Sequence, residues 1–411
     1  MIGPIAILPE DAPDRRSFAF LQGPPGPLFY RLGHALRACG VAVNRINLSG
    51  GDRRDWRDGA IDYRGRVSDW PAFFDAFVRR EGITDLILFG DCRPYHISAH
   101  GVAASRGVRT HVLEEGYIRP HWMTLERDGV NARSSLRRDA QWLLAEAARL
   151  PPEPDLPPVT ASFRRRAHDS YWHYHRVVTD RWRYPHYRSH RSGSIIAEGL
   201  GWSWKFVRQR LSPRPLDTVL HRLAGQPMFV LPLQLSGDYQ IRAHSPFSDM
   251  QSAATYVLTS FAANAPADVH LLVKAHPLDC SFFGWPRFLA KLARRLGVDG
   301  RVHFIEAGDL EAIMRTAHGM VCINSTSATL ALDRGTPVCT LGEAIYDFPG
   351  LTHQAHLDGF WTHQTPPEPG VYAAFRRVLM DRCLVRGGVA SESAANILVD
   401  SMLERLGCRP A

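Results

Sequence analysis

Short apolar runs alternate with stretches of helical hydrophobic spacing along the first part of the chain. A run such as residues 85–89 is typical of a buried strand, whereas residues 27–39 carry apolar side chains at helical spacing and stop at Gly40. Ser68 is the expected N-cap of a helix over 70–80. The pattern predicts strands at 17–21, 41–48, 85–89 and 108–113, and helices at 27–39, 70–80 and 97–106.

A second series of the same kind begins near residue 226. Residues 140–225 interrupt the pattern, with a stiff proline-rich linker at 151–158 and then a helical, basic and aromatic stretch. The order of strands and helices predicts parallel sheets with crossover helices in both series. The expected strands are 228–235, 270–277, 301–306, 319–324 and 337–342, and the expected helices lie near 248–263, 286–296, 309–317 and 326–334.

These patterns predict an α/β protein with two Rossmann-like domains and a ligand site in the cleft between them. A chain of 411 residues fits two domains, because one hydrophobic core rarely organises that many. The expected segments are an N-terminal Rossmann-like domain (1–140), a helical basic-aromatic segment (141–225), a C-terminal Rossmann-like domain (226–390) and a C-terminal helix (391–411).

Composition excludes several other classes. The 45% hydrophobic and 22% charged residues exclude a largely disordered chain. No apolar run approaches the roughly 18–20 residues that cross a bilayer, and the N-terminus lacks the basic region of a secretory signal. The seven cysteines are scattered without a CxxC pair, so a reducing cytoplasm fits best. Nicotinamide, P-loop, HExxH and GxSxG motifs are absent, and neither a metal site nor a cofactor is expected.

The basic residues are almost all arginine. The net charge is +8, and of 49 basic residues only Lys205, Lys274 and Lys291 are lysines. Arginine binds phosphate and carboxylate groups bidentately, so nucleic acid, an anionic membrane surface and an anionic small substrate are all candidate partners. Nucleic-acid binding is not expected, because no recognition helix and no RNP-like strand appears.

Polar clusters follow five of the predicted strands, where the carboxyl ends of parallel strands line a ligand crevice. They lie at 90–96, 114–120, 234–240, 274–277 and 324–327, with Arg242 just beyond the third. The candidate ligand-contacting residues are Asp91, Arg93, His96, Glu115, Arg119, Gln234, Asp238, Arg242, Lys274, His276, Pro277, Asn324, Ser325, Thr326 and Ser327.

Two of these clusters suit a phosphate group. Residues 324–327 follow a predicted strand and open a predicted helix, so hydroxyls, free backbone N–H groups and the helix dipole converge there. The alternative is an ordinary helix N-cap. Lys274 and His276 end another strand of the same half and would add a cation and an imidazole.

Asp238 and Glu115 are the candidate reactive carboxylates. Each adjoins a glycine at a predicted strand end, one in each half. Two such carboxylates facing a cleft could serve as nucleophile and general acid/base in glycosyl transfer, although Gly-Asp and Glu-Gly pairs also occur in simple turns.

Taken together, these segments resemble the capsular-polysaccharide biosynthesis family, and within it the KpsS-type retaining β-Kdo transferases, relatives of KpsC. The resemblance runs from about residue 15 to 345, and LFGDCRPYH and EEGYIRP are its most specific motifs. The matching segments are FLQGPPGPLFYRLGHAL (20–36), INLSGGD (46–52), DYRG (62–65), LFGDCRPYH (88–96), EEGYIRP (114–120), LPLQLSGDYQI (231–241), KAHP (274–277) and NSTSATLAL (324–332).

The resemblance implies a GT-B-like transferase that moves β-Kdo from CMP-β-Kdo to a (lyso)phosphatidylglycerol, starting the poly-Kdo linker of a capsular polysaccharide. By the same resemblance Asp238 is the nucleophile, Glu115 is the acidic residue of the acceptor-side domain, and His276 and Ser325 bind the nucleotide. Kdo carries a carboxylate, for which Arg93, Arg119 and Arg242 are the available cations. CMP has one phosphate, so a metal-binding diphosphate motif is not required.

Alternatives within and outside this class remain open. One is a transferase for another nucleotide sugar, and another is a non-catalytic glycolipid-binding or export-coupling protein of the capsule machinery. A lipid acceptor implies a cytoplasmic protein peripherally attached to the inner membrane, with other capsule assembly proteins as further partners. The basic-aromatic segment is one candidate for this attachment, through Arg164, Arg165, Arg166, Arg181, Arg183 and the rings beside them, unless those rings pack between the domains.

Overall fold

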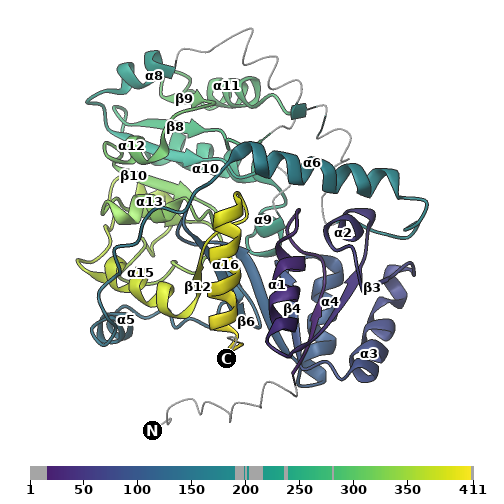
Figure 1. Ribbon diagram of the computed structural model, residues 1–411. Coiled ribbons are helices and arrows are strands. Elements are labelled where there is room, and N and C mark those ends of the chain that lie inside the picture. The colour runs from purple at the N-terminus through teal and green to yellow at the C-terminus, as the bar shows by residue number, and fades with distance from the viewer. Residues whose placement is uncertain are drawn as a thin grey trace. The chain divides into compact units, whose positions relative to one another are not determined.

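The computed structural model describes residues 16–189, 199, 201–202, 216–235, 239–279 and 282–408 (Figure 1). The chain forms two compact units, each discontinuous in sequence. Among the described residues, the first comprises 16–135, 154–189 and 382–408, and the second comprises 136–153 and those between 191 and 381. This division differs from the four consecutive segments expected from the sequence.

The first unit, in its described part, contains a seven-stranded sheet of order β12-β6-β5-β4-β1-β2-β3. The five strands from β5 to β3 are parallel, and β6 and β12 add an antiparallel edge. Its strands are β1 (Ser17–Phe20), β2 (Ala42–Asn47), β3 (Ala60–Asp62), β4 (Asp85–Phe89), β5 (Arg109–Glu115), β6 (Trp122–Arg127) and β12 (Leu384–Arg386). Its helices are α1 (Leu28–Ala38), α2 (Gly50–Asp55), α3 (Trp70–Glu81), α4 (Pro94–Ser105), α6 (Phe163–Thr179) and α16 (Glu392–Arg405), with 3-10 turns at Val67–Asp69 and Asn131–Arg133.

Both faces of this sheet are covered by apolar side chains, because successive strand residues point to opposite faces. In β1, Phe18 and Phe20 enter the core beneath α1 and α16, whereas Ala19 enters the core beneath α3 and α4. Helices α1 and α16 lie side by side although they come from opposite ends of the chain (Figure 1). The expected separate C-terminal helix is therefore part of the first Rossmann-like core.

The second unit contains a five-stranded, wholly parallel sheet of order β11-β10-β7-β8-β9. Helices α10 and α11 supply much of its core. The strands are β7 (Met228–Pro232), β8 (His270–Lys274), β9 (Val302–Ile305), β10 (Gly319–Cys322) and β11 (Val338–Thr340). The helices are α5 (Ala140–Ala147), α8 (Leu216–Leu223), α9 (Tyr239–Ala243), α10 (Met250–Asn264), α11 (Trp285–Arg295), α12 (Leu310–Met314), α13 (Ala328–Asp333), α14 (Leu357–Phe360) and α15 (Val371–Arg382).

Each sheet has the Rossmann order, with the third, second, first, fourth and fifth strands of its series side by side. The predicted α/β class with two Rossmann-like halves is therefore confirmed. Two local predictions were wrong. Asp69, not Ser68, is the N-cap residue of α3. The strand expected at 108–113 runs on to Glu115, because Glu114 and Glu115 pair with Thr124 and Met123 of β6.

Candidate functional site

In the first unit, polar side chains meet where the strand order reverses, between β1 and β4. Such a switch point is where open α/β sheets bind ligands. Gln22 follows β1 and Arg93 follows β4, and Nη1 of Arg93 donates to Oε1 of Gln22 at 3.0 Å. The Nε2 of Gln22 donates to Asp52 (3.2 Å) and to the hydroxyl of Tyr187 (3.1 Å). Sequence reasoning missed Gln22, although it stands in the first motif of the family resemblance.

His96 is fully buried beside this switch point, in the first turn of α4. Its Nδ1 lies 2.7 Å from the carbonyl oxygen of Gly90, so Nδ1 carries the proton and donates it. Burial and the nearby Arg93 charge lower the pKa of His96 to about 3, so the ring is neutral. Its Nε2 is buried with no hydrogen-bond partner among the described residues. This nitrogen is therefore a buried acceptor whose hydrogen-bonding capacity is not used by the described residues.

Two consecutive glutamates end β5, and their environments differ. Oε1 of Glu115 is ion-paired with Nη2 of Arg166. Glu114 lies beside Gly90, and its Oε1 accepts a hydrogen bond from the Glu115 backbone N–H at 3.2 Å. Burial, reinforced by the Glu115 and Asp91 charges, raises the pKa of Glu114 to about 7. Glu114 can therefore both hold and release a proton near neutral pH, and it stands next to the predicted Glu115.

The remaining candidates of this unit lie around the same edge. Asp91 is buried and accepts hydrogen bonds from the Cys92 thiol (3.1 Å) and from the Val130 backbone N–H (3.4 Å), so it anchors the loop after β4. Burial lowers the pKa of the Arg93 guanidinium. Arg119 is exposed, and its Nε donates to the carbonyl oxygen of Gly116.

Part of the basic-aromatic segment folds onto this edge of the first unit. Nδ1 of His173 lies 2.6 Å from Oδ2 of Asp55, and the Tyr184 hydroxyl donates to Asp62 at 2.7 Å. The ring of Tyr187 stacks on that of Tyr95, with centroids 6.1 Å apart. Residues 163–188 therefore contribute polar and aromatic walls to the first site.

In the second unit the switch point lies between β7 and β10, and two amide side chains join it. Nε2 of Gln234, after β7, donates to Oδ1 of Asn324 at 2.9 Å. The backbone N–H of Asn324, after β10, donates to Oε1 of Gln234 at 3.2 Å. Two residues that the sequence placed in separate clusters are thus brought together.

The serine-rich loop after Asn324 is held by its own hydroxyls and by a tyrosine. Oγ of Ser325 and Oγ of Ser327 lie 2.7 Å apart, and Tyr346 donates to the carbonyl oxygen of Ser325 at 2.6 Å. The carbonyl oxygen of Thr326 accepts from the Thr329 hydroxyl. Ser327 precedes α13 but makes no side-chain capping bond. The hydroxyls of Ser325 and Ser327 bond each other, and Oγ of Ser325 also accepts from the Ser327 backbone N–H at 3.2 Å, which stabilises the turn before α13.

Lys274 ends β8, next to β7, and is buried. His276 follows it, partly buried, and its Nδ1 accepts from the backbone N–H of Leu278 at 3.1 Å. Because this bond occupies Nδ1 as an acceptor, a neutral ring carries its proton on Nε2 as a donor. Pro277 is exposed. Arg242 is exposed on α9, and the predicted nucleophile Asp238 lies outside the described residues.

A pocket of about 480 Å³ opens at the same edge of the second sheet, after β11. The Glu343 backbone N–H donates to the carbonyl oxygen of His244 at 2.8 Å, which joins its two walls. Its lining combines imidazole, hydroxyl and carboxylate groups, and no sequence cluster marked it. The lining residues are Ala243, His244, Ser245, Pro246, Thr340, Leu341, Gly342, Glu343 and Asp347.

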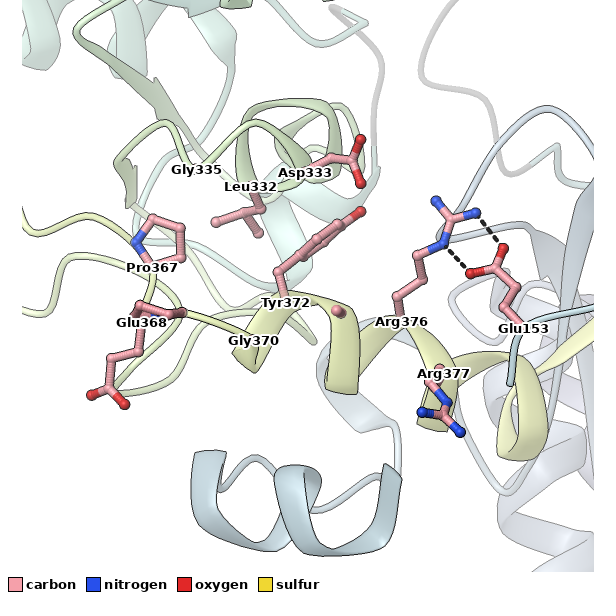
Figure 2. A pocket seen from close by; sticks show the side chains of 12 residues that line it. Glu153, Leu332, Asp333, Gly335, Pro367, Glu368, Gly370, Tyr372, Arg376 and Arg377 are labelled. Carbon is pink, nitrogen blue, oxygen red and sulfur yellow. Dashed lines mark hydrogen bonds and ion pairs between the residues drawn. The ribbon is translucent and has the colours of Figure 1, made fainter. Parts of the chain in front are cut away.

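A second pocket of the same unit, of about 470 Å³, is lined by the end of α13, the start of α15 and Glu153 (Figure 2). Gly335, which precedes β11, places it at the amino ends of the strands, away from the switch point. Arg376 and Glu153 form a two-bond ion pair at 3.0 and 2.6 Å (Figure 2). These two charged groups satisfy each other and join Glu153 to α15.

No group of three or more His, Cys, Asp or Glu side chains that could hold a metal ion occurs in the described part of the chain. None of the described helices is both long and apolar enough to cross a membrane.

Fold and site together define a class of protein with two Rossmann-like α/β units, each carrying a polar cluster at its switch point. The family model described as "Capsule polysaccharide biosynthesis protein" matches residues 84–389. The chain therefore belongs to this capsule polysaccharide biosynthesis family, as the sequence motifs predicted.

Two relatives by sequence, LipB and KpsS, agree with the family assignment. Capsule polysaccharide modification protein LipB of Neisseria meningitidis is 33% identical over 382 residues, which cover 90% of this chain and 91% of LipB. Capsule polysaccharide export protein KpsS of Escherichia coli is 32% identical over 371 residues, covering 89% of this chain and 94% of KpsS. Among solved structures, KpsC, a beta Kdo 2,7 transferase of Thermosulfurimonas dismutans, matches with 15% identity and a TM-score of 0.46, covering 95% of this chain and 100% of that one.

Proposed function

We propose that this protein is a retaining glycosyltransferase that moves β-Kdo from CMP-β-Kdo to a (lyso)phosphatidylglycerol at the cytoplasmic side of the inner membrane. The observation that carries the proposal is Glu114. In a chain of the capsule polysaccharide family, a carboxyl group with a pKa of about 7 lies at the end of β5, beside Gly90 and within the electrostatic influence of Arg93. A purely structural glycolipid clamp needs no group poised to exchange a proton at neutral pH.

The second unit would hold the donor. One hydroxyl of the Ser325–Ser327 pair and the Nε2 proton of His276 are donors suited to the single phosphate of CMP, with Lys274 supplying positive charge. The pocket beside His244 and Glu343 offers room for the nucleoside or the sugar. Gln234 supports this site by fixing Asn324.

The first unit would supply proton transfer and acceptor contacts, whereas the nucleophile, Asp238, would come from the C-terminal half of the chain. In the first displacement a carboxylate oxygen of Asp238 bonds to the anomeric carbon, and CMP leaves with the electrons of the broken C–O bond. In the second, the acceptor hydroxyl attacks that carbon, Glu114 takes its proton, and Asp238 is released as a carboxylate. His96 Nε2 would accept a hydrogen bond from a substrate hydroxyl, and Arg93 would pair with an anionic group.

The decisive experiment incubates purified protein with CMP-Kdo, or with UDP-sugars, and a short-chain lysophosphatidylglycerol. Mass spectrometry should detect one added Kdo only with CMP-Kdo, and NMR should show the β configuration in the product. Transfer from a UDP-sugar alone would assign a different donor. No transfer from any donor, with retained binding of the lipid, would support the non-catalytic alternative.

A further inference from the structure

Helix α6 and the turn after it have an inverted amphipathic pattern. A surface helix ordinarily buries apolar side chains and exposes charged ones. Here Asp169, His173 and Asp180 are buried, whereas Tyr171 is 61% and Trp182 is 78% exposed. Several exposed side chains recur at helical spacing along one face, and together with Arg181 and Trp182 of the following turn they form what we call the aromatic face. Its members are Arg164, His168, Tyr171, Trp172, His175, Val178, Arg181 and Trp182.

The buried face is fixed by specific polar contacts, so the inversion is a property of the fold. Asp169 accepts from Nε of Arg165 at 2.8 Å, and His173 lies 2.6 Å from Asp55. The Asp180 carboxylate pairs with Arg176 at 2.9 Å. Rotating the helix to bury its rings would break the contact between His173 and Asp55 of α2 and would bring Asp169, His173 and Asp180 into water.

The rings of the aromatic face contact one another rather than a core. The centroids of Tyr171 and Trp172 lie 5.3 Å apart, and those of Trp172 and His175 lie 5.4 Å apart. Tryptophan and tyrosine in such positions favour the headgroup level of a bilayer, because an apolar ring and a polar N–H or O–H are both accommodated there.

The charge of this face selects the kind of surface it contacts. The acidic residues of the helix and the following turn, Asp169 and Asp180, are buried and neutralised by arginines. Arg164 and Arg181 are exposed, and neither forms an ion pair with any residue that the structure describes. The aromatic face therefore presents positive charge without exposed carboxylates, which complements an anionic surface.

We propose that the aromatic face of α6 is the membrane-docking surface of this protein and that its partner is a bilayer containing anionic phospholipid. The inference rests on the proposed function, because an enzyme with a lipid acceptor must reach the bilayer that contains it. The proposal retains only two of the five arginines that the sequence offered for membrane attachment, Arg164 and Arg181. Arg165, Arg166 and Arg183 are held in ion pairs with Asp169, Glu115 and Asp62, so they are not the contacting cations.

The test measures sedimentation of the full chain with phosphatidylcholine vesicles, with and without phosphatidylglycerol, in the absence of any donor. The parent should bind the anionic vesicles and be released by salt. Replacing Arg164 and Arg181 with glutamine should weaken binding about fivefold for each arginine. The triple variant Tyr171→Ala/Trp172→Ala/Trp182→Ala should lower the bound fraction at least as much as the loss of the two arginines does. Brominated lipids should quench the tryptophan fluorescence of the parent more than they quench that of the Trp182→Phe variant.

Matched controls separate this surface from general charge and hydrophobicity. Arg294→Gln/Arg295→Gln removes two exposed arginines of α11, and Phe282→Ala removes an exposed ring of the second unit. Both control variants should sediment as the parent does. Unchanged sedimentation of the aromatic triple variant with the vesicles would overturn the proposal. If the parent were a dimer and the triple variant a monomer with the same vesicle binding, the aromatic face would be a dimer interface and the proposal would also fall.

Activity on a short-chain, water-soluble acceptor distinguishes failure of this inference from failure of the proposed function. Full activity on that acceptor with unchanged vesicle binding in the variants would refute only the docking surface. Loss of vesicle binding in the variants, with no transferase activity even in the parent, would uphold the docking surface and refute the proposed reaction.

Discussion

Gln234 and Asn324 exchange two hydrogen bonds, of 2.9 and 3.2 Å, across the switch point of the second sheet. Gln22 and Arg93 are joined at 3.0 Å across the equivalent point of the first sheet. In both units a glutamine after the first strand of the series thus reaches the loop after the fourth. The loops that carry the proposed ligand groups are therefore tied directly to the first strand of each sheet.

Replacing Gln234 with alanine should weaken CMP binding by about tenfold, because the Asn324 loop loses both bonds that position it. Isothermal titration with CMP measures this effect. Gln141→Ala removes an exposed amide of the same unit and should bind CMP normally. Equal affinity in the two variants would show that the Gln234–Asn324 pair does not support the nucleotide site.

Glu114→Gln should slow transfer by about a hundredfold or more, as expected when a general acid/base is lost. In the parent, kcat/KM for the acceptor should fall as the pH drops through about 7, because Glu114 becomes protonated and can no longer take a proton. In the Glu114→Gln variant, kcat/KM should not show this fall on the acidic limb of the pH profile. A Glu115→Gln variant provides the comparison, and loss of the limb there instead would return the role to Glu115.

The same group should affect stability. Because burial raises the folded-state pKa of Glu114 above its ordinary value, its stabilising contribution is complete at low pH and is lost as the pH rises toward 7. Glu114→Gln removes this dependence. The melting temperature of the variant relative to the parent should therefore be higher at pH 8 than at pH 5, and differential scanning fluorimetry across pH measures it.

Asp238→Ala should abolish transfer while leaving CMP binding and folding intact, because a nucleophile supplies chemistry rather than ground-state affinity. His276→Ala and Ser325→Ala should instead weaken CMP binding, each by roughly 1.5–3 kcal/mol if the lost bond is charge-assisted. Parallel kcat and CMP titrations on the three variants separate the two roles. Near-normal turnover by Asp238→Ala would favour a front-side mechanism.

Asp85→Asn should destabilise the first unit by about 3–5 kcal/mol, because it leaves buried cations without their partner. Asp85 is fully buried at the start of β4, between Arg16 (2.8 Å), Arg109 (2.9 Å) and His111 (2.8 Å). Burial opposes its charge, but the hydrogen bonds from these groups hold its pKa well below the ordinary value. Its contribution is therefore present above pH 4 and is lost as the pH falls further.

Urea denaturation at pH 7 tests this prediction. Asp75→Asn breaks ion pairs with Arg79 and Arg106 at the surface and should change stability little. Since Asp85 lies at the amino end of its strand, CMP binding by the folded Asp85→Asn protein should be unchanged. A variant as stable as the parent would mean that the cluster is held by its other contacts.

The sequence by itself determined the fold class and the places where function could reside. Apolar runs and helical spacing are local patterns, and burial on both faces makes parallel strands such as β4 nearly continuous in apolar residues. The expected strand over 85–89 agrees residue for residue with β4. The family motifs, with their polar strand ends, were likewise readable from the sequence.

Only the tertiary structure decided which groups meet and in what environment. Glu114 and Glu115 are neighbours on one strand, yet Glu114 is desolvated beside Gly90 whereas Glu115 is paired with Arg166. Local spacing along the chain sets neither the Gly90 contact nor the Arg166 ion pair. Likewise, α16 joins the first core through contacts with α1. Helix α6 exposes its rings because Asp55 and other distant groups hold its opposite face. Local periodicity specifies an element and its faces, whereas pairing between distant segments depends on the free energy of the whole packed unit.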